Sequence, residues 1–160
     1  MSRHTGDDAP VTLRRATRAD AARLADLYLG ARHAAVPAVP PLVHLDAEVR
    51  QWFRNVVVPE RETWLAQSAG HPLAVMVLDG HELDQLYVHP QWTGHGVGSA
   101  LVRLAQSRRP ERLTLWTFQS NSGAQRFYER HGFVAVQHTD GSGNEEQSPD
   151  IRYVWVPAIK

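Results

Sequence analysis

The sequence predicts a single domain of the α/β (α+β) class, with about seven strands and about four helices. Three observations lead to this prediction. Segments with the two-residue period of strands alternate along the chain with segments of helical period. A glycine-rich loop lies between one such strand and the helix that follows it. The chain has 160 residues and is 42% hydrophobic, which suits one globular domain at residues 10–160 behind a flexible polar tail at residues 1–9.

The first half of the chain is predicted to contain four strands and two helices. The strands are expected at residues 11–15, 63–66, 73–78 and 82–88, and turns at residues 69–70 and 79–80 join the last three as hairpins. The first helix begins at Asp20, ends near His33 and buries Leu24, Leu27 and Tyr28. The second helix begins at Asp46 and carries Val49, Trp52, Phe53 and Val56. Residues 34–41 are rich in proline and should form a stiff loop without a helix.

The second half is predicted to contain two helices and three strands. One helix carries Leu101, Leu104 and Ala105 on one face and stops before Pro110. Residues 113–118 are apolar on both faces, which is typical of a central parallel strand. The other helix follows, and strands are then expected at residues 133–139 and 151–156, with a polar loop between them. Four tryptophans should lie in the core or, as the alternative, in the wall of a pocket: Trp52, Trp64, Trp116 and Trp155.

The loop after the fourth strand carries glycines at positions 94, 96 and 98. Such a loop gathers backbone N–H groups around a phosphate, and a helix start adds roughly half a positive charge. A nucleoside-triphosphate loop would need a lysine after the glycines, and none follows Gly98. The dinucleotide fingerprint would need a third glycine where this chain has Ser99 or Leu101. An ordinary strand-to-helix turn is the alternative to a phosphate site.

A second motif occupies residues 121–133. Asn121 or Ser120 can cap the start of a helix, and Gly132 can close its end in a left-handed conformation. Asn121 and Tyr128 are seven residues apart, which places them on one face of that helix. A tyrosine at this position could also be a half-buried aromatic that only packs the helix on the sheet.

Together the two motifs resemble those of the GCN5-related N-acetyltransferase (GNAT) family. Gly96 and Gly98 match the family's Gln/Arg-x-x-Gly-x-Gly/Ala loop, whereas Thr93 stands where Gln or Arg is usual. The second motif matches Asn-x-x-Ala-x-x-Phe-Tyr-x-x-x-Gly-Phe at every named position: Asn121, Ala124, Phe127, Tyr128, Gly132 and Phe133. The resemblance covers nearly the whole chain. It implies a central mixed twisted sheet of about seven strands flanked by about four helices.

The resemblance implies acetyl transfer from acetyl-CoA, as co-substrate, to a primary amine by direct attack in a ternary complex. In the family, the tyrosine that Tyr128 matches protonates the departing thiolate, and the asparagine that Asn121 matches contacts the cofactor arm. A backbone N–H near Val88 is expected to polarise the thioester carbonyl. The expected cofactor-binding residues are Leu86, Tyr87, Val88, Thr93, Gly94, His95, Gly96, Val97, Gly98, Ser99, Asn121 and Tyr128.

The attacking amine must lose a proton, and Glu82 is the first candidate for the base. Counted back from the glycine loop, it falls where histone acetyltransferases of the family hold their catalytic glutamate. Strand alternation puts Asp84, Leu86 and Val88 on the same face as Glu82. Asp84 is the second candidate. A water chain in place of a single base, and a merely solvated Glu82, both stay open.

The acceptor is expected to be a small cationic amine such as a polyamine, an amino sugar or a basic antibiotic. In the family, the loop between the last two strands is one wall of the acceptor pocket. Here that loop carries Asp140, Glu145, Glu146 and Asp150 without an intervening lysine or arginine, so it could attract a cation. Four carboxylates in a solvated loop are the alternative. The candidate substrate-binding residues are His33, His44, Asp84, Glu145 and Glu146.

Two other functions stay open. One is a protein or peptide N-acetyltransferase, which would need an open groove for its substrate. The other is a non-catalytic acyl-CoA-binding sensor on the same fold, which loss of Tyr128 or of the glycines would have indicated. Neither is lost.

Composition argues against several further classes. The chain has 17 basic and 17 acidic residues, so no overall field attracts nucleic acid or an anionic membrane. It has no cysteine, which excludes disulfides, thiolate metal sites and an acyl-cysteine mechanism and favours the cytoplasm. The nine histidines include no His-x-x-x-His pair, so no metal is expected. We see no secretory signal and no apolar run of the roughly 20 residues that span a membrane. Members of the family often form dimers, so the resemblance leaves a homodimer open.

Overall fold

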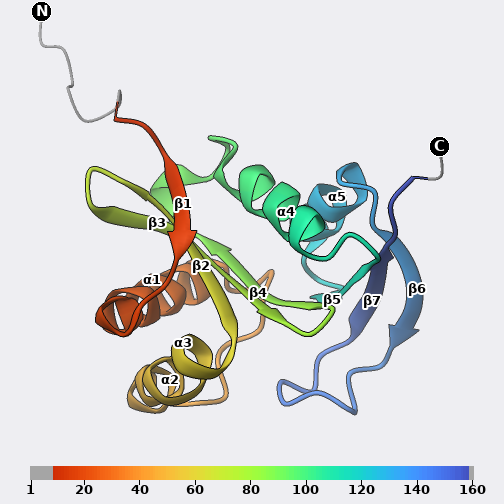
Figure 1. Cartoon of the computed structure of the whole chain (residues 1–160). Helices are drawn as coiled ribbons and strands as arrows, with labels where there is room; N and C mark the ends of the chain where they lie inside the picture. Colours follow the sequence, from red (N-terminus) through yellow and green to blue (C-terminus); the bar gives the residue numbers. More distant parts are fainter. Residues whose placement is uncertain (1–8, 159–160) are drawn as a thin grey trace, which may run out of the picture.

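The computed structural model describes residues 9–158, which form a mixed sheet of seven strands with helices on both faces (Figure 1). The strands are β1 (Thr12–Arg15), β2 (Glu62–Ser68), β3 (His71–Asp79), β4 (Glu82–Val88), β5 (Leu113–Phe118), β6 (Val134–Thr139) and β7 (Asp150–Trp155). Their order across the sheet is β1-β2-β3-β4-β5-β7-β6. Within the described sheet, β4 and β5 pair in parallel and all other neighbours are antiparallel. The predicted fold class and number of strands are confirmed.

Five α-helical segments flank the sheet: α1 (Ala21–Ala34), α2 (Asp46–Trp52), α3 (Val58–Glu60), α4 (Val97–Arg108) and α5 (Ser122–Arg130). The single helix that the sequence predicts from Asp46 is α2 followed without a break by a π-helical turn at Phe53–Val57 and by α3. Figure 1 shows α1, α2 and α3 on one face of the sheet and α4 and α5 on the other.

Strand β3 runs through the centre of the sheet and divides the core into two clusters. Val75 and Val77 belong to the cluster beneath α1, and Met76 and Leu78 belong to the cluster beneath α4 and α5. Successive strand residues point to opposite faces, so a strand that is apolar on both faces can contribute to both clusters. The continuous apolar run of β3 therefore reflects helices on both of its faces.

Strand β4 carries a β-bulge at Asp84. Leu83 pairs with Leu78 of β3, and Gln85 pairs with the preceding β3 residue, Val77. Asp84 is therefore the extra residue of β4, with no β3 residue opposite it. A bulge of this kind bends the strand and changes the direction of the side chains that follow.

The bulge corrects the predicted orientation of the β4 side chains. Leu83, Leu86 and Val88 all contact the cluster beneath α4 and α5, whereas Tyr87 contacts the cluster beneath α1. Glu82, as the neighbour of Leu83, points to the opposite face. The prediction that Glu82 shares a face with Leu86 and Val88 is wrong, because simple alternation ends at the bulge.

Trp116 lies outside the core that the sequence predicts for it. The residue is 44% exposed, and the guanidinium of Arg152 on β7 lies 5.0 Å from the centre of its ring. Helices α1 to α3 do not extend over this part of the sheet in Figure 1. Trp52, Trp64 and Trp155 are partly buried.

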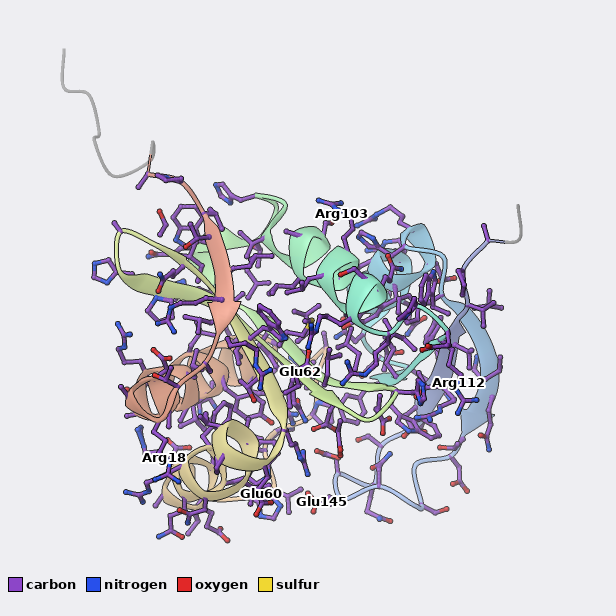
Figure 2. The ribbon with its side chains drawn as sticks, in the orientation of Figure 1. Arg18, Glu60, Glu62, Arg103, Arg112 and Glu145 are labelled. Atoms are coloured by element: carbon purple, nitrogen blue, oxygen red, sulfur yellow. The ribbon has the colours of Figure 1, made fainter. Side chains whose placement is uncertain are left out.

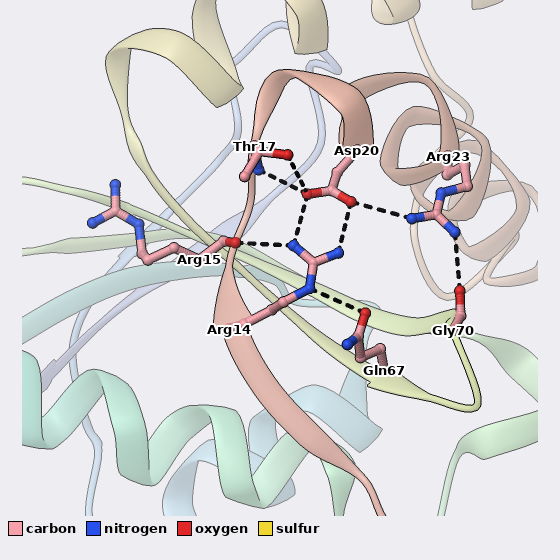
Figure 3. A network of polar contacts seen from close by, with 7 residues as sticks. All are labelled: Arg14, Arg15, Thr17, Asp20, Arg23, Gln67 and Gly70. Atoms are coloured by element: carbon pink, nitrogen blue, oxygen red, sulfur yellow. Dashed lines mark hydrogen bonds and ion pairs between the residues drawn. The ribbon is translucent and has the colours of Figure 1, made fainter.

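A buried carboxylate joins β1 to the start of α1 (Figure 3). Asp20 accepts hydrogen bonds from both terminal nitrogens of Arg14 at 2.8 Å, from the Thr17 backbone N–H at 2.7 Å and from Arg23 at 3.2 Å. Asp20 occupies the N-cap position of α1, but its side chain bonds to these donors and does not cap the helix. The hydrogen bond from Arg14, more than any other contact, holds the pKa of Asp20 well below its usual range.

Apart from residue 9, the tail predicted at residues 1–9 lies outside the described residues. Within residues 9–158, no helix combines the length and the apolar character that crossing a bilayer requires.

Candidate active site

A cavity of about 650 Å³ opens between the loop after β4 and the helices α4 and α5, and we call it the cofactor cavity. It is lined by most of the residues predicted to bind the cofactor: Leu86, Val88, Thr93, Gly94, Gly96, Val97, Gly98, Ser99, Asn121 and Tyr128. Trp92, Gly123 and Arg130, which the sequence did not single out for this role, line it as well.

The glycine loop has the backbone geometry of an anion site. Gly96 adopts a φ of 80° directly before α4, and no side chain caps that helix start. The first helical hydrogen bond runs from the Ala100 N–H to the Gly96 carbonyl at 3.0 Å. The N–H groups of residues 97–99 consequently have no helical partner and are available to a phosphate. A Cβ at Gly98 would lie 3.3 Å from the Phe127 ring, so a larger side chain here would require that ring to move.

Three predicted contacts differ from the expectation. The Thr93 hydroxyl donates to the Pro90 carbonyl at 3.0 Å, within its own loop, although Thr93 lines the cavity. His95 is exposed, lies 5.2 Å from Trp92 between ring centres, and does not line the cavity. Tyr87 is absent from it too, because the bulge in β4 directs this side chain to the other face.

Helix α5 holds Tyr128 at the inner end of the cofactor cavity. Its ring packs against Phe127 and Phe133 at centre distances of 5.1 and 5.5 Å, and the residue is 9% exposed. Among the described residues, none forms a hydrogen bond that shifts the pKa of the Tyr128 hydroxyl. Burial raises this pKa above its usual value. The phenol is therefore a protonated donor at neutral pH. Asn121 caps α5, because its Oδ1 accepts from the Ala124 N–H at 3.2 Å.

The parallel strands β4 and β5 are paired only at Glu82 and Thr114. Beyond this pair they separate and leave a cavity of about 100 Å³, which we call the reaction gap. Tyr128 and Leu86 line both the reaction gap and the cofactor cavity. Asp84 lines the gap as well, so Tyr128 and a carboxylate residue border the same small cavity.

A cavity of about 610 Å³, the acceptor cavity, continues from the reaction gap. Four carboxylates and one guanidinium line it: Glu82, Asp84, Glu146, Asp150 and Arg32. Trp116 and Thr117 of β5 line both this cavity and the reaction gap. Trp116 therefore fulfils the alternative prediction of a pocket wall.

The two candidate bases on β4 differ in position. Glu82 is paired with Arg152 at 2.7 Å and lines the acceptor cavity but not the reaction gap. Asp84 is paired with Arg61 at 2.7 Å and lines both the acceptor cavity and the reaction gap. Burial raises the pKa of Asp84, against the opposing effect of Arg61. A carboxylate with a raised pKa is a stronger proton acceptor.

The remaining predicted substrate residues lie apart from one another. Glu146 lines the acceptor cavity and lies 3.7 Å from Arg32. His44 and Glu145 pair at 2.9 Å beside a neighbouring cavity, and Glu145 is labelled in Figure 2 at the opposite end of the view from Arg103 of α4. His33 pairs with Asp46 at 3.4 Å and lines neither cavity.

Two of the four carboxylates predicted for the loop between β6 and β7 have structural roles, and one of them, Asp150, is the first residue of β7. Asp150 is buried and bonds to the Thr139 hydroxyl and to the Asn144 side-chain amide. Asp140 accepts from the Ser142 N–H at 2.9 Å. Of the other two, Glu146 lines both the acceptor cavity and the neighbouring one, and Glu145 lines only the neighbouring one.

Arg32, Gln85 and Thr117 also line the acceptor cavity, although no motif in the sequence singles them out. Arg32 follows Tyr28 by one helical turn, so the helical period would have placed it on the same buried face. The bulge that turns Gln85 has no comparable signal in the sequence.

A family model described as "Acetyltransferase (GNAT) domain" matches residues 59–135. Among curated proteins, the peptidyl-lysine N-acetyltransferase YjaB of Escherichia coli is 37% identical over 118 residues, which are 71% of this chain and 80% of that protein. The peptidyl-lysine N-acetyltransferase YiaC of Escherichia coli is 31% identical over 84 residues, 52% of this chain and 57% of that protein.

Among solved structures, the solution structure of apo YjaB from Escherichia coli superposes with a TM-score of 0.72 and 25% identity. The superposition covers 93% of this chain and 99% of that one. The sheet, the two motifs and these relatives agree on the same fold. The chain belongs to the GNAT family of acetyltransferases and is an acyltransferase.

Proposed function

We propose that this chain transfers the acetyl group of acetyl-CoA to the side-chain amine of a lysine in a peptide or protein. The observation that carries this proposal is the reaction gap, which Tyr128 lines from the cofactor side and Asp84 from the acceptor side. The choice of acceptor is supported by the relatives YjaB and YiaC, both named peptidyl-lysine N-acetyltransferases. A peptide or protein substrate, the alternative that the sequence leaves open, thus takes precedence over a small amine.

The residues of the cofactor cavity suit acetyl-CoA, which supplies the acetyl group as a thioester. The N–H groups of residues 97–99 would hold its pyrophosphate, and Gly98 leaves the approach open. Backbone groups of β4 beyond Glu82, which have no β5 partner, would bind the pantetheine arm as a neighbouring strand would.

Tyr128 is the proposed proton donor to the leaving sulfur. A tyrosine hydroxyl is protonated at neutral pH, and burial raises the pKa of Tyr128 further above its usual value. The contacts of its ring with Phe127 and Phe133 fix its position. A positioned general acid of this kind contributes about 10² to 10⁴ in rate.

Asp84 is the proposed base for the incoming lysine. An ammonium has no lone pair, so a proton must leave before the amine attacks, and free lysine has a pKa near 10.4. The carboxylates of the acceptor cavity attract the ammonium, and Asp84 is the one that also borders the reaction gap. Glu82, which is paired with Arg152 and does not line the reaction gap, stays a prediction as the alternative base.

The test is acetylation of an Nα-blocked peptide that contains one lysine, followed by CoA release and by mass spectrometry of the product. The matched control peptide carries arginine in place of lysine. We expect acetylation at the lysine Nζ, none of the control peptide, and strong slowing by Tyr128→Phe. No acetylation of lysine peptides by a protein that binds acetyl-CoA would contradict the proposal.

A small cationic amine is the second candidate, because four carboxylates and a single guanidinium line the acceptor cavity. Spermidine, an aminoglycoside and free amino acids belong in the same assay. A kcat/KM for one of them far above that of every lysine peptide would favour this candidate.

A further inference from the structure

A second cavity, of about 560 Å³, adjoins the acceptor cavity, and we call it the flanking cavity. It lies among α1, α2, the loop before α2 and the loop between β6 and β7. Arg32, Gln85 and Glu146 line both cavities. A chain whose lysine enters the acceptor cavity would therefore continue directly into the flanking cavity.

The floor of the flanking cavity is apolar. Tyr28 and Val49 are buried there, and Trp52 and Val56 are partly exposed to it. Val43 at its edge is 57% exposed. This floor suits the methylene stem of a long side chain.

The rim of the flanking cavity is acidic. Glu48, Glu145 and Glu146 line it, against the single guanidinium of Arg32. His44 lies between two of these carboxylates, 2.9 Å from Glu145 and 3.9 Å from Glu48. An apolar floor below an acidic rim fits a side chain with an aliphatic stem and a cationic head.

Arg32, at the boundary of the two cavities, has an unused hydrogen-bond donor. The residue is 5% exposed, and its Nε has no hydrogen-bond partner among the described residues. Its terminal nitrogens make only long contacts, 3.4 Å to the Tyr87 hydroxyl, 3.2 Å to the Pro40 carbonyl and 3.7 Å to Glu146. A buried donor without an acceptor is costly. Nε itself is covered, but Arg32 lines both cavities, so a substrate carbonyl that passes between them would meet the part of its guanidinium that faces them.

We propose that the flanking cavity is a subsite for a basic side chain, lysine or arginine, next to the acetylated lysine in the substrate. This inference rests on the proposed function and names the class of peptide that the enzyme prefers. The apolar floor binds the stem of the neighbouring side chain, the three glutamates bind its cation, and Arg32 binds the intervening backbone.

The test compares two Nα-blocked peptides with one acceptor lysine each. One carries arginine beside the lysine, and the other carries citrulline, which has nearly the same shape without the charge. We expect a KM about tenfold lower for the arginine peptide, with the same kcat. In the double variant Glu48→Gln/Glu145→Gln this difference should fall to less than twofold. The control, Glu60→Gln/Glu111→Gln, removes two exposed carboxylates outside both cavities and should keep it.

The outcomes separate this inference from the proposed function. Equal KM values for the two peptides, or a tenfold difference that survives in Glu48→Gln/Glu145→Gln, would overturn the subsite while the lysine acetyltransferase activity stands. Absence of acetylation on both peptides, with turnover of a small amine, would overturn both proposals.

Discussion

Replacement of Tyr128 by phenylalanine should separate catalysis from folding. The substitution removes only the hydroxyl, and the ring keeps its contacts with Phe127 and Phe133. Among the described residues, none forms a hydrogen bond that shifts the pKa of this hydroxyl, so its removal leaves no such partner unpaired. The free energy of unfolding should therefore change by less than about 0.5 kcal/mol. The rate should fall much further, because the leaving sulfur loses its proton donor.

The expected loss in kcat is about 10² to 10³, which corresponds to about 3 to 4 kcal/mol in the activation barrier. The KM for acetyl-CoA should stay within about twofold, because the glycine loop and the backbone of β4 are unchanged. The assay is CoA release with a thiol reagent at saturating acetyl-CoA. Urea denaturation of the same preparations gives the free energy of unfolding.

Tyr153→Phe is the matched control. Tyr153 on β7 is 2% exposed, lines none of the three cavities of the site, and has its hydroxyl beside Glu129. This variant should lose about 1 kcal/mol of stability and keep its kcat. A Tyr128→Phe enzyme with kcat within threefold of the unchanged protein would refute the role of Tyr128. A loss of rate that accompanies an equal loss of stability in both variants would show a structural effect instead.

Three further predictions concern the loop, the base and the N-terminal ion pair. Gly98→Val should raise the KM for acetyl-CoA at least about tenfold, because its side chain meets the Phe127 ring, whereas Gly30→Ala on α1, with nothing within 4 Å, should not. Asp84→Asn should lower kcat/KM about 10²-fold. In the pH profile of kcat/KM, the rate of the unchanged protein should fall on the acid side at a higher pH than an ordinary aspartate gives, because burial raises the pKa of Asp84, and Asp84→Asn should remove this fall. If the fall persists in Asp84→Asn and disappears in Glu82→Gln, the base is Glu82. Asp20→Asn should cost about 2 kcal/mol of unfolding free energy at pH 7. Because the folded pKa of Asp20 lies below the unfolded value of 3.8, that difference should be present above this pH and shrink as the pH falls, in urea titrations from pH 7 to 2.

The cofactor side of the site could be predicted from the sequence because its determinants are local. Gly96 and Gly98 act through backbone conformation and close approach, and the spacing of Asn121 and Tyr128 follows the helical period. Such properties depend on a few consecutive residues. Most of the residues predicted for this role do line one cavity.

The acceptor side could not be predicted equally well because it depends on contacts between distant segments. Arg32 of α1 meets Glu146, 114 positions later, only when the loop between β6 and β7 folds over the sheet. Trp116 was expected in the core or in a pocket wall, and its exposure follows from the helices that cover β5 on one side only. His33 and His44 are near in sequence to the proline-rich loop, yet only His44 reaches a cavity.

The bulge at Asp84 gives a physical reason why the two carboxylates of β4 are not equivalent. At Glu82 the strands β4 and β5 are still joined, through the pair with Thr114, so a thioester cannot pass between them there. Asp84 is the residue at which β4 leaves its regular pairing with β3, and it borders the gap that opens beyond Glu82. Alternation alone would put both carboxylates on the face that carries Leu86 and Val88. Because of the bulge, Leu86 lines the cofactor cavity from one side of the sheet while Asp84 lines the acceptor cavity on the other. A base is useful only where amine and thioester can meet, and on β4 that condition favours Asp84.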